Sequence, residues 1–389
     1  MAIRTTGRID FLDNIRALAI MCLVIFYHPA VAYSTVIAEH LNFYFVEPTY
    51  LFYDVIALFF DIFLMPFLFL IAGFFALPSL KKRSAKRYIV EKFVHVMIPF
   101  FLGVFLLNAF PNYIKGLFHH QIESGYMFYW GQIFLKNIGT FFLEDKASVH
   151  LWFLSLLFLF YLTLTVVYKV DPKWFEKSTE TKKLSSFFLL CFALVGAICF
   201  FIINFFMPDF GAWVNFEFFW TFQFTRFPLY VLYFFLGVFC YKNGWMTKGF
   251  FLPLWLIIAL IITPINLYVI IHFFGHLFET WYLKALHACL HSFSCLGLCL
   301  SIIEISKKGL NFSNSVLRLL SSNGYAIYIL HFNFFIGIEF FLYTARIPTI
   351  LKYLISGVLA YFISLVISQG ILRWIPGLNY MLYGKRKKL

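Results

Sequence analysis

Ionisable side chains within long apolar runs are the residues of this chain that could do chemistry. The first run, RIDFLDNIRALAIMCLVIFYH, begins with Arg8, Asp13 and Arg16 and ends at His28. An ionisable group in hydrocarbon is costly unless it is paired or hydrated, so such residues usually have a function. Asp13 and Arg16 are three residues apart and can pair on one helix face. His28 follows about 18 Å further along a helix, where an imidazole could act as a general base.

The same run also has a purely structural interpretation. Arg8, Asp13 and Arg16 would then be interfacial anchors, and His28 would reach the membrane surface from the far end of the helix. This run alone does not decide between the two interpretations, so the other apolar runs must be compared with it.

Other apolar runs also contain side chains that could form a site. These residues are Asp54, Asp61, His150, Trp152, Arg226, Tyr328 and His331. His28, His150 and Arg226 fall in the outer halves of their predicted helices and could form one site that faces outward. His331 lies about 18 Å from the inner end of its helix, near the middle of the membrane. Each of them alone is also explained as an interfacial residue.

Metal and nucleotide chemistry have no motif in the chain. His119 and His120 are adjacent, and His287 and His291 share a helix face, but no carboxylate or thiol is spaced as a third ligand. The sequence contains no GxSxG, HExxH or Walker motif. We therefore expect no metal site and no bound cofactor.

The composition is that of a polytopic membrane protein. Of 389 residues, 62% are hydrophobic and only 13% are charged, whereas a soluble domain has about 25% charged residues. The formal charge of +13 comes from short basic clusters between apolar runs, which indicates the positive-inside rule and not nucleic-acid binding. The seven cysteines all lie in apolar runs and are interpreted as small buried residues, not disulfides.

The elements that must position these residues are about ten membrane helices in a single domain, 1–389. About 20 apolar residues cross a bilayer. The predicted spans are 12–33, 50–77, 93–111, 150–169, 186–207, 225–242, 250–271, 282–305, 318–342 and 350–374. Basic residues concentrate in alternate loops, at 81–87, 169–183, 242–248 and 307–308, and in the tail. The sequence therefore predicts an all-α fold with both termini in the cytoplasm, and an amphipathic outer connection at 112–149.

Five motifs in chain order resemble the membrane-bound acyltransferase family 3. They are RIDFLDNIRALA with His28, MPFLFLIAGFFA, HLWFL at 150–154, RFPLYVLYFFLGV and GYAIYILH, which ends at His331. The resemblance covers nearly the whole chain. Two family positions differ here: Lys92 and His95 stand where arginines precede the helix-three proline, and Phe332 stands where a second histidine is usual.

The resemblance implies an integral O-acyltransferase of the bacterial inner membrane. A cytoplasmic acyl-coenzyme A, the donor substrate, would pass its acyl group to a hydroxyl of a periplasmic glycan. The chain most resembles family members that succinylate osmoregulated periplasmic glucans, which implies a succinyl donor and a glucan acceptor. Two alternatives stay open: O-acetylation of another surface polysaccharide, and export of a glycan or lipid-linked intermediate.

The resemblance also implies roles for the site residues. His28 would take the hydroxyl proton, Arg16 paired with Asp13 would hold the donor or orient helix one, and His331 would be a second proton acceptor or a contact of the donor arm. The expected substrate contacts are Arg8, His150, Trp152, Arg226 and Tyr328. The lipid bilayer is the expected surrounding partner.

Overall fold

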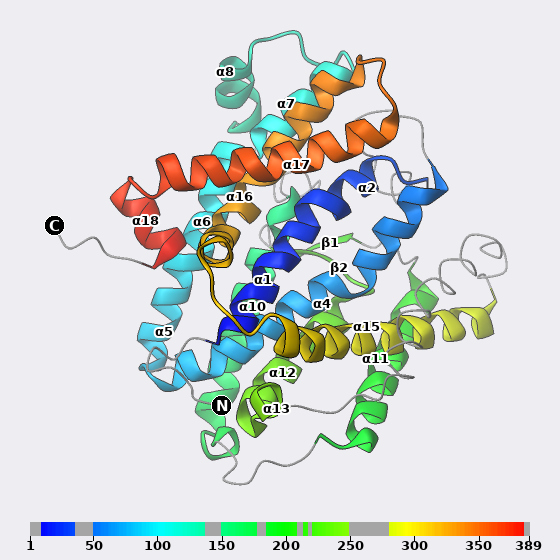
Figure 1. Cartoon of the computed structure of the whole chain (residues 1–389), viewed down its shortest axis with the longest axis vertical. Coiled ribbons are helices and arrows are strands. Elements are labelled where there is room, and N and C mark those ends of the chain that lie inside the picture. Colours follow the sequence, from blue (N-terminus) through cyan, green and yellow to red (C-terminus); the bar gives the residue numbers. More distant parts are fainter. Residues whose placement is uncertain are drawn as a thin grey trace.

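Long apolar helices make up almost all of the described chain. The computed structural model describes residues 9–35, 50–136, 149–176, 184–207, 213–216, 220–248 and 280–384. Within these ranges, eight helices are long and apolar enough to cross a membrane (Figure 1). The predicted all-α polytopic membrane fold is therefore confirmed.

The helices follow the predicted spans in chain order. They are α1 (Asp10–Cys22), η1 (Leu23–Tyr27) and α2 (His28–Ala32); α4 (Leu51–Lys81); α5 (Ala85–Lys92), η2 (Phe93–Met97), α6 (Ile98–Leu102), η3 (Gly103–Leu107) and α7 (Ala109–Phe118); α10 (Trp152–Val170); α11 (Ser186–Phe206); α12 (Phe227–Asn243); α15 (Trp281–Gly309); α16 (Ser315–Tyr343); and α17 (Thr349–Ile367) with η8 (Ser368–Leu372). Shorter pieces are α8 (Tyr126–Phe128), η4 (Tyr129–Phe134), η5 (Val149–Leu151), η6 (Lys173–Phe175), α13 (Trp245–Lys248) and α18 (Pro376–Tyr383). The predicted span 250–271 lies outside the described residues.

The third helix is longer than the predicted 93–111, since it runs from residue 85 to residue 118. Ser84 caps its start, because the hydroxyl accepts a hydrogen bond from the backbone N–H of Arg87. Asn112 lies on a buried face and donates to the carbonyl of Asn108 at 2.9 Å. The helix therefore continues past these polar residues, because it satisfies them within its own length.

The outer connections form two different structures. In α8 and η4, Met127 and Phe128 are exposed while Tyr129 and Phe134 are buried, which agrees with the predicted amphipathic character. The aromatic stretch before α12 contains a hairpin of β1 (Trp213–Phe216) and β2 (Trp220–Gln223), paired antiparallel. This hairpin was not predicted from the sequence.

Two glycines let α4 and α12 cross closely. A Cβ on Gly73 would lie 1.9 Å from the carbonyl oxygen of Phe234, and a Cβ on Gly237 would lie 2.0 Å from that of Leu70. Small residues at such crossings allow two backbones to pack directly, which is a common source of helix association in lipid. This crossing positions both Asp61 of α4 and Arg226, which precedes α12.

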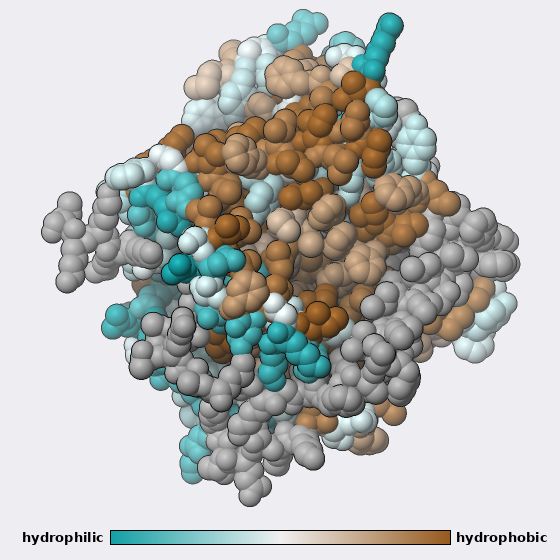
Figure 2. All heavy atoms as spheres, viewed as in Figure 1, coloured by the Kyte–Doolittle hydropathy of each residue, from teal (hydrophilic) through white to brown (hydrophobic). Residues whose placement is uncertain are grey.

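The N-terminal helix lies inside the bundle. The run α1–η1–α2 packs against α4, α16 and α17, and Figure 1 shows it between α4 and α17. Its inward residues Leu12, Leu23, Val24 and Ala30 are fully buried. Figure 2 shows hydrophobic side chains spread over α17, whereas hydrophilic ones gather where α17 meets α18 and near the end of α15. The first polar run of the sequence is therefore held at the centre of the protein.

Candidate functional site

Three histidines from distant parts of the chain meet in the bundle. Nδ1 of His28 lies 2.8 Å from Nε2 of His331. The ring of His150 lies 5.0 Å from that of His331 and stacks on Phe332 at 5.1 Å. The sequence grouped His28 with His150 and placed His331 deeper, whereas the structure brings all three together.

A π-helical turn brings His28 to this position. Pro29 has no N–H, and its ring conflicts with the carbonyl four residues earlier, which belongs to Ile25. The wide turn η1 precedes the proline and relieves this conflict. Helix α17 covers the displaced backbone: a Cβ on Gly357 would lie 2.4 Å from the Ile25 oxygen, and the Tyr353 hydroxyl donates to the Phe26 carbonyl at 3.3 Å. Such π turns recur at functional sites.

The hydrogen-bond partners assign the proton on each ring. Nδ1 of His331 lies 2.8 Å from the carbonyl oxygen of Tyr328. A carbonyl only accepts, so this nitrogen carries the proton and Nε2 of a neutral His331 has a lone pair. Nδ1 of His28 must then donate to that lone pair. Nε2 of His28 is left as an acceptor, and no described residue hydrogen-bonds to it. This is the arrangement that a general base requires.

His150 holds this arrangement from the side. It is buried, and its Nε2 donates to the carbonyl of Ile329 at 3.2 Å. The hydroxyl of Tyr328 donates to the backbone carbonyl of His150. Because the Tyr328 carbonyl also accepts from His331, Tyr328 links the backbones that carry two of the three histidines.

A buried ion pair lies next to the histidines. Arg226 pairs with Asp61 of α4, and its guanidinium also donates to the Asp61 carbonyl at 3.1 Å. The hydroxyl of Tyr27 donates to the Asp61 carboxylate at 3.1 Å, and Tyr27 immediately precedes His28. Arg226, which the sequence suggested as a substrate contact, is therefore bound to Asp61 and connected to the histidines through Tyr27.

A cavity of about 670 Å³ extends from one end of the bundle toward the histidines. Its deep part is apolar and is lined by Leu68, Phe153, Leu154 and Tyr328. Tyr328 is the residue that this cavity shares with the histidine cluster. Its basic end is lined by Arg16, Arg83, Lys92, His95 and Arg373.

The predicted pair at the start of helix one lines this cavity. Arg16 lies 3.2 Å from the carboxylate of Asp13, which confirms the predicted pairing, and its side chain is 46% exposed. Arg16 is therefore far along the helix from His28, on the same cavity. Its position suits contact with the donor and not with the reacting atoms.

The remaining predicted residues have other surroundings. Trp152 is buried and packs against Tyr230 of α12 at 5.5 Å. Arg8 lies outside the described residues. Among the described residues, no group of three potential metal ligands occurs. His287 and His291 pack beside Phe200 of α11.

The sequence gave no indication of the roles of Arg373 and Tyr27. Arg373 stands at the end of the predicted last span, where a basic residue is usually an anchor. Tyr27 looks like one more aromatic residue in an apolar run. The residues that could have raised interest were Asp54 and Asp61, because acidic groups within a span need partners. Asp54 binds Ser34 and Thr35 at the end of helix one.

One comparison with known proteins identifies a family. A family model described as an acyltransferase domain matches residues 9–369, which is nearly the whole chain. No curated protein and no solved structure gives a significant match.

Proposed function

The chain belongs to the acyltransferase 3 family, and from this premise we propose that it transfers an acyl group from acyl-coenzyme A to hydroxyls of a periplasmic glucan. The family match makes the protein a membrane O-acyltransferase. The donor, the acceptor, the residues that act and the bacterial inner membrane as its location are the parts that we propose.

The observation that carries the proposal is the cavity that connects a basic end to the histidine cluster. A coenzyme A has an anionic phosphate end and a long uncharged arm that carries the thioester. The cavity has cations at one end and apolar side chains at the other, where Tyr328 separates it from His331. Positive charge attracts phosphate, and an apolar channel accommodates an uncharged arm.

The protons assigned to the two rings suggest the chemical step. The acceptor hydroxyl gives its proton to Nε2 of His28 while its oxygen attacks the thioester carbonyl carbon. A C–O bond forms, the C–S bond breaks, and the proton passes from His28 to the leaving thiolate. During the step His28 becomes an imidazolium, whose Nδ1–H still donates to His331. That hydrogen bond is then charge-assisted, so it is stronger in the transition state than in the ground state.

The proposed succinyl group and glucan acceptor come from sequence resemblance. The chain resembles glucan biosynthesis protein C, which succinylates osmoregulated periplasmic glucans, over nearly its whole length. O-acetylation of another surface polysaccharide uses the same residues with a smaller donor. An exporter of a glycan or lipid-linked intermediate would use them as a conduction path without any acyl transfer.

Acyl transfer by the purified protein tests the function. The protein in detergent is mixed with succinyl- or acetyl-coenzyme A and a periplasmic glucan, and mass spectrometry of the glucan detects each acyl group. We expect succinyl-glucan and free coenzyme A. Acetyl-glucan alone would support the second donor, and glucan unmodified by either donor would refute the proposed reaction. The glucan fraction of cells with and without the gene gives an independent measurement.

The proposed direction of transfer requires a defined topology. We predict that Ser84, next to a basic cluster, lies in the cytoplasm and that Gly125 lies in the periplasm. Single cysteines at these two positions, labelled in intact and in permeabilised cells, measure this. Equal labelling of both positions from outside would contradict the assignment.

A further inference from the structure

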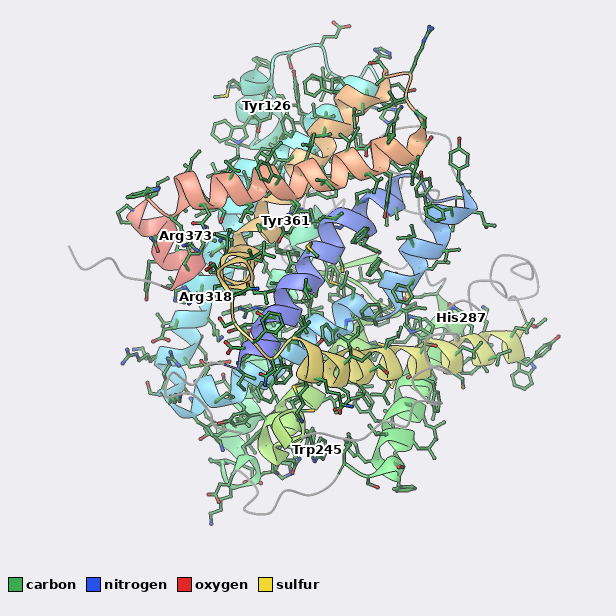
Figure 3. All side chains as sticks on the ribbon, in the orientation of Figure 1. Tyr126, Trp245, His287, Arg318, Tyr361 and Arg373 are labelled. Carbon is green, nitrogen blue, oxygen red and sulfur yellow. The ribbon has the colours of Figure 1, made fainter. Side chains whose placement is uncertain are left out.

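Arg373 lines the basic end of the cavity, but it lies beyond residue 369, where the family match ends. It follows η8 and precedes α18, at the turn between α17 and α18 that Figure 3 labels. Helix α18 closes this side of the cavity, since Asn379, Met381 and Tyr383 also line it. The end of the chain therefore contributes a wall that the family match does not include.

His95 does not supply a cation that points into the cavity. Its Nδ1 lies 2.9 Å from the carbonyl oxygen of Met381, so the ring donates to α18. The hydroxyl of Tyr325 donates to the His95 carbonyl at 2.8 Å. The residue at a position where an arginine was expected therefore holds α18 against the bundle.

The other arginines at the cavity have carboxylate partners. Arg16 pairs with Asp13, and Arg83 pairs with Glu91 at 2.5 Å. Lys92 lies over the ring of Tyr161 at 4.2 Å. Their charge is partly compensated by an acid or is placed on an aromatic face.

Arg373 has no carboxylate partner among the described residues. One of its terminal nitrogens donates to the Ser322 hydroxyl at 2.7 Å, and the guanidinium lies 4.8 Å from the ring centre of Tyr383. Its Nε is buried without a hydrogen-bond partner. Burial raises the pKa of the Tyr383 phenol above its ordinary value, despite the opposing effects of Ser368 and Arg373, so the ring is uncharged at neutral pH. A guanidinium held on a neutral ring keeps its full charge for a ligand.

We propose that Arg373, held by Ser322 and Tyr383 on the α18 wall, binds a phosphate of the acyl donor. It supplies here the arginine–phosphate contact that His95 cannot make. A guanidinium suits this ligand because its planar donors match phosphate oxygens in pairs, which a lysine ammonium cannot reproduce. This inference depends on the proposed acyl-coenzyme A donor.

Calorimetric binding of coenzyme A to the full-length protein in detergent tests the inference. We expect Arg373→Ala to weaken binding about 10- to 100-fold, because a hydrogen bond to a charged group contributes about 1.5–3 kcal/mol. Arg373→Lys should recover only part of the loss. The matched control is Arg318→Ala on α16, an exposed arginine at the same end of the bundle that does not line the cavity (Figure 3). It should change the affinity less than about twofold, as expected for an exposed charge.

Two further probes separate a phosphate contact from other roles. Pantetheine lacks the phosphates, so its affinity should be the same in wild type and Arg373→Ala. A parallel loss for pantetheine would show that Arg373 only supports the cavity, and would overturn the proposal. Phosphatidylglycerol that weakens coenzyme A binding in wild type but not in Arg373→Ala would assign the phosphate to a lipid and also overturn it.

The donor and the residue fail in different ways. A wild-type protein that binds no coenzyme A would refute the proposed donor. A wild type that binds coenzyme A, together with an unchanged Arg373→Ala variant, would refute only the role of Arg373.

Discussion

The replacement His28→Gln tests the proton assignment at the site. Glutamine has an amide N–H₂ that can replace the Nδ1–H donor to His331, but it has no basic nitrogen. The change therefore removes the base while it leaves a donor of similar reach. The proposed mechanism predicts a loss of acyl transfer without a comparable loss of folded protein.

The size of the loss decides between two explanations. The neutral hydrogen bond between His28 and His331 contributes about 0.5–1.5 kcal/mol, so losing it alone slows transfer by about tenfold at most. A positioned general base contributes about 10²–10⁴ in rate. We therefore expect His28→Gln to lower kcat by about 10²–10⁴.

His331→Gln should have a smaller effect than His28→Gln. His331 does not take the hydroxyl proton; it accepts from His28 and stabilises the imidazolium. A hydrogen bond to a charged group contributes about 1.5–3 kcal/mol, which corresponds to about 10- to 100-fold in rate. The predicted order of activity is therefore wild type, His331→Gln and then His28→Gln.

The assay is transfer of a labelled acyl group to glucan by purified protein, normalised to the folded fraction from size exclusion. His287→Gln is the matched control, because His287 is also buried on a membrane helix but packs beside Phe200, away from the cluster. A His28→Gln variant within tenfold of wild type would refute the base assignment. Equal losses in His28→Gln and His287→Gln would show a general effect of replacing buried histidines.

The remaining predictions concern the cavity and the packing around the site. Arg16→Ala should raise KM for the acyl donor by about tenfold, whereas Arg318→Ala should leave it unchanged; equal KM values in both variants would mean that Arg16 is only a topological charge. Gly357→Ala should lower the free energy of unfolding by about 1–3 kcal/mol, because its Cβ would lie 2.4 Å from the Ile25 oxygen, whereas Gly370→Ala meets no atom within 4 Å; thermal unfolding in detergent compares them. Asp61→Asn should lower stability by about 3–5 kcal/mol in the same assay, since it leaves a buried arginine without its partner, and an unchanged melting temperature would contradict that account of the ion pair.

The membrane fold could be predicted from the sequence because insertion of a helix depends on local properties. Twenty apolar residues are long enough to span a bilayer whatever surrounds them, and a bilayer makes polar residues within spans conspicuous. For this reason the described spans were predicted, and His28, His150 and His331 were identified as unusual. The Asp13–Arg16 pair was predictable for the same reason, since one helical turn determines it.

Helix ends were predicted less well where polar residues bond within the helix. Asn112 looked like the start of a loop, but it is satisfied by Asn108 one turn earlier. The hairpin before α12 was also missed, because its aromatic residues suit an interfacial segment equally well. Hydropathy gives no information on which local bonds a polar residue will find.

Which polar residues meet was decided only by the tertiary structure. His28 and His331 are 303 residues apart, and their contact depends on how α2 crosses α16 and on the π turn before Pro29. The proton on each ring depends in turn on the Tyr328 carbonyl, a backbone atom that no side-chain pattern reveals. Arg373 looked like an anchor until α18 was seen to fold back over the cavity. The sequence by itself determined which residues a membrane must accommodate, because transfer into lipid is a property of each segment; the packing of segments distant in sequence determined which of them act together.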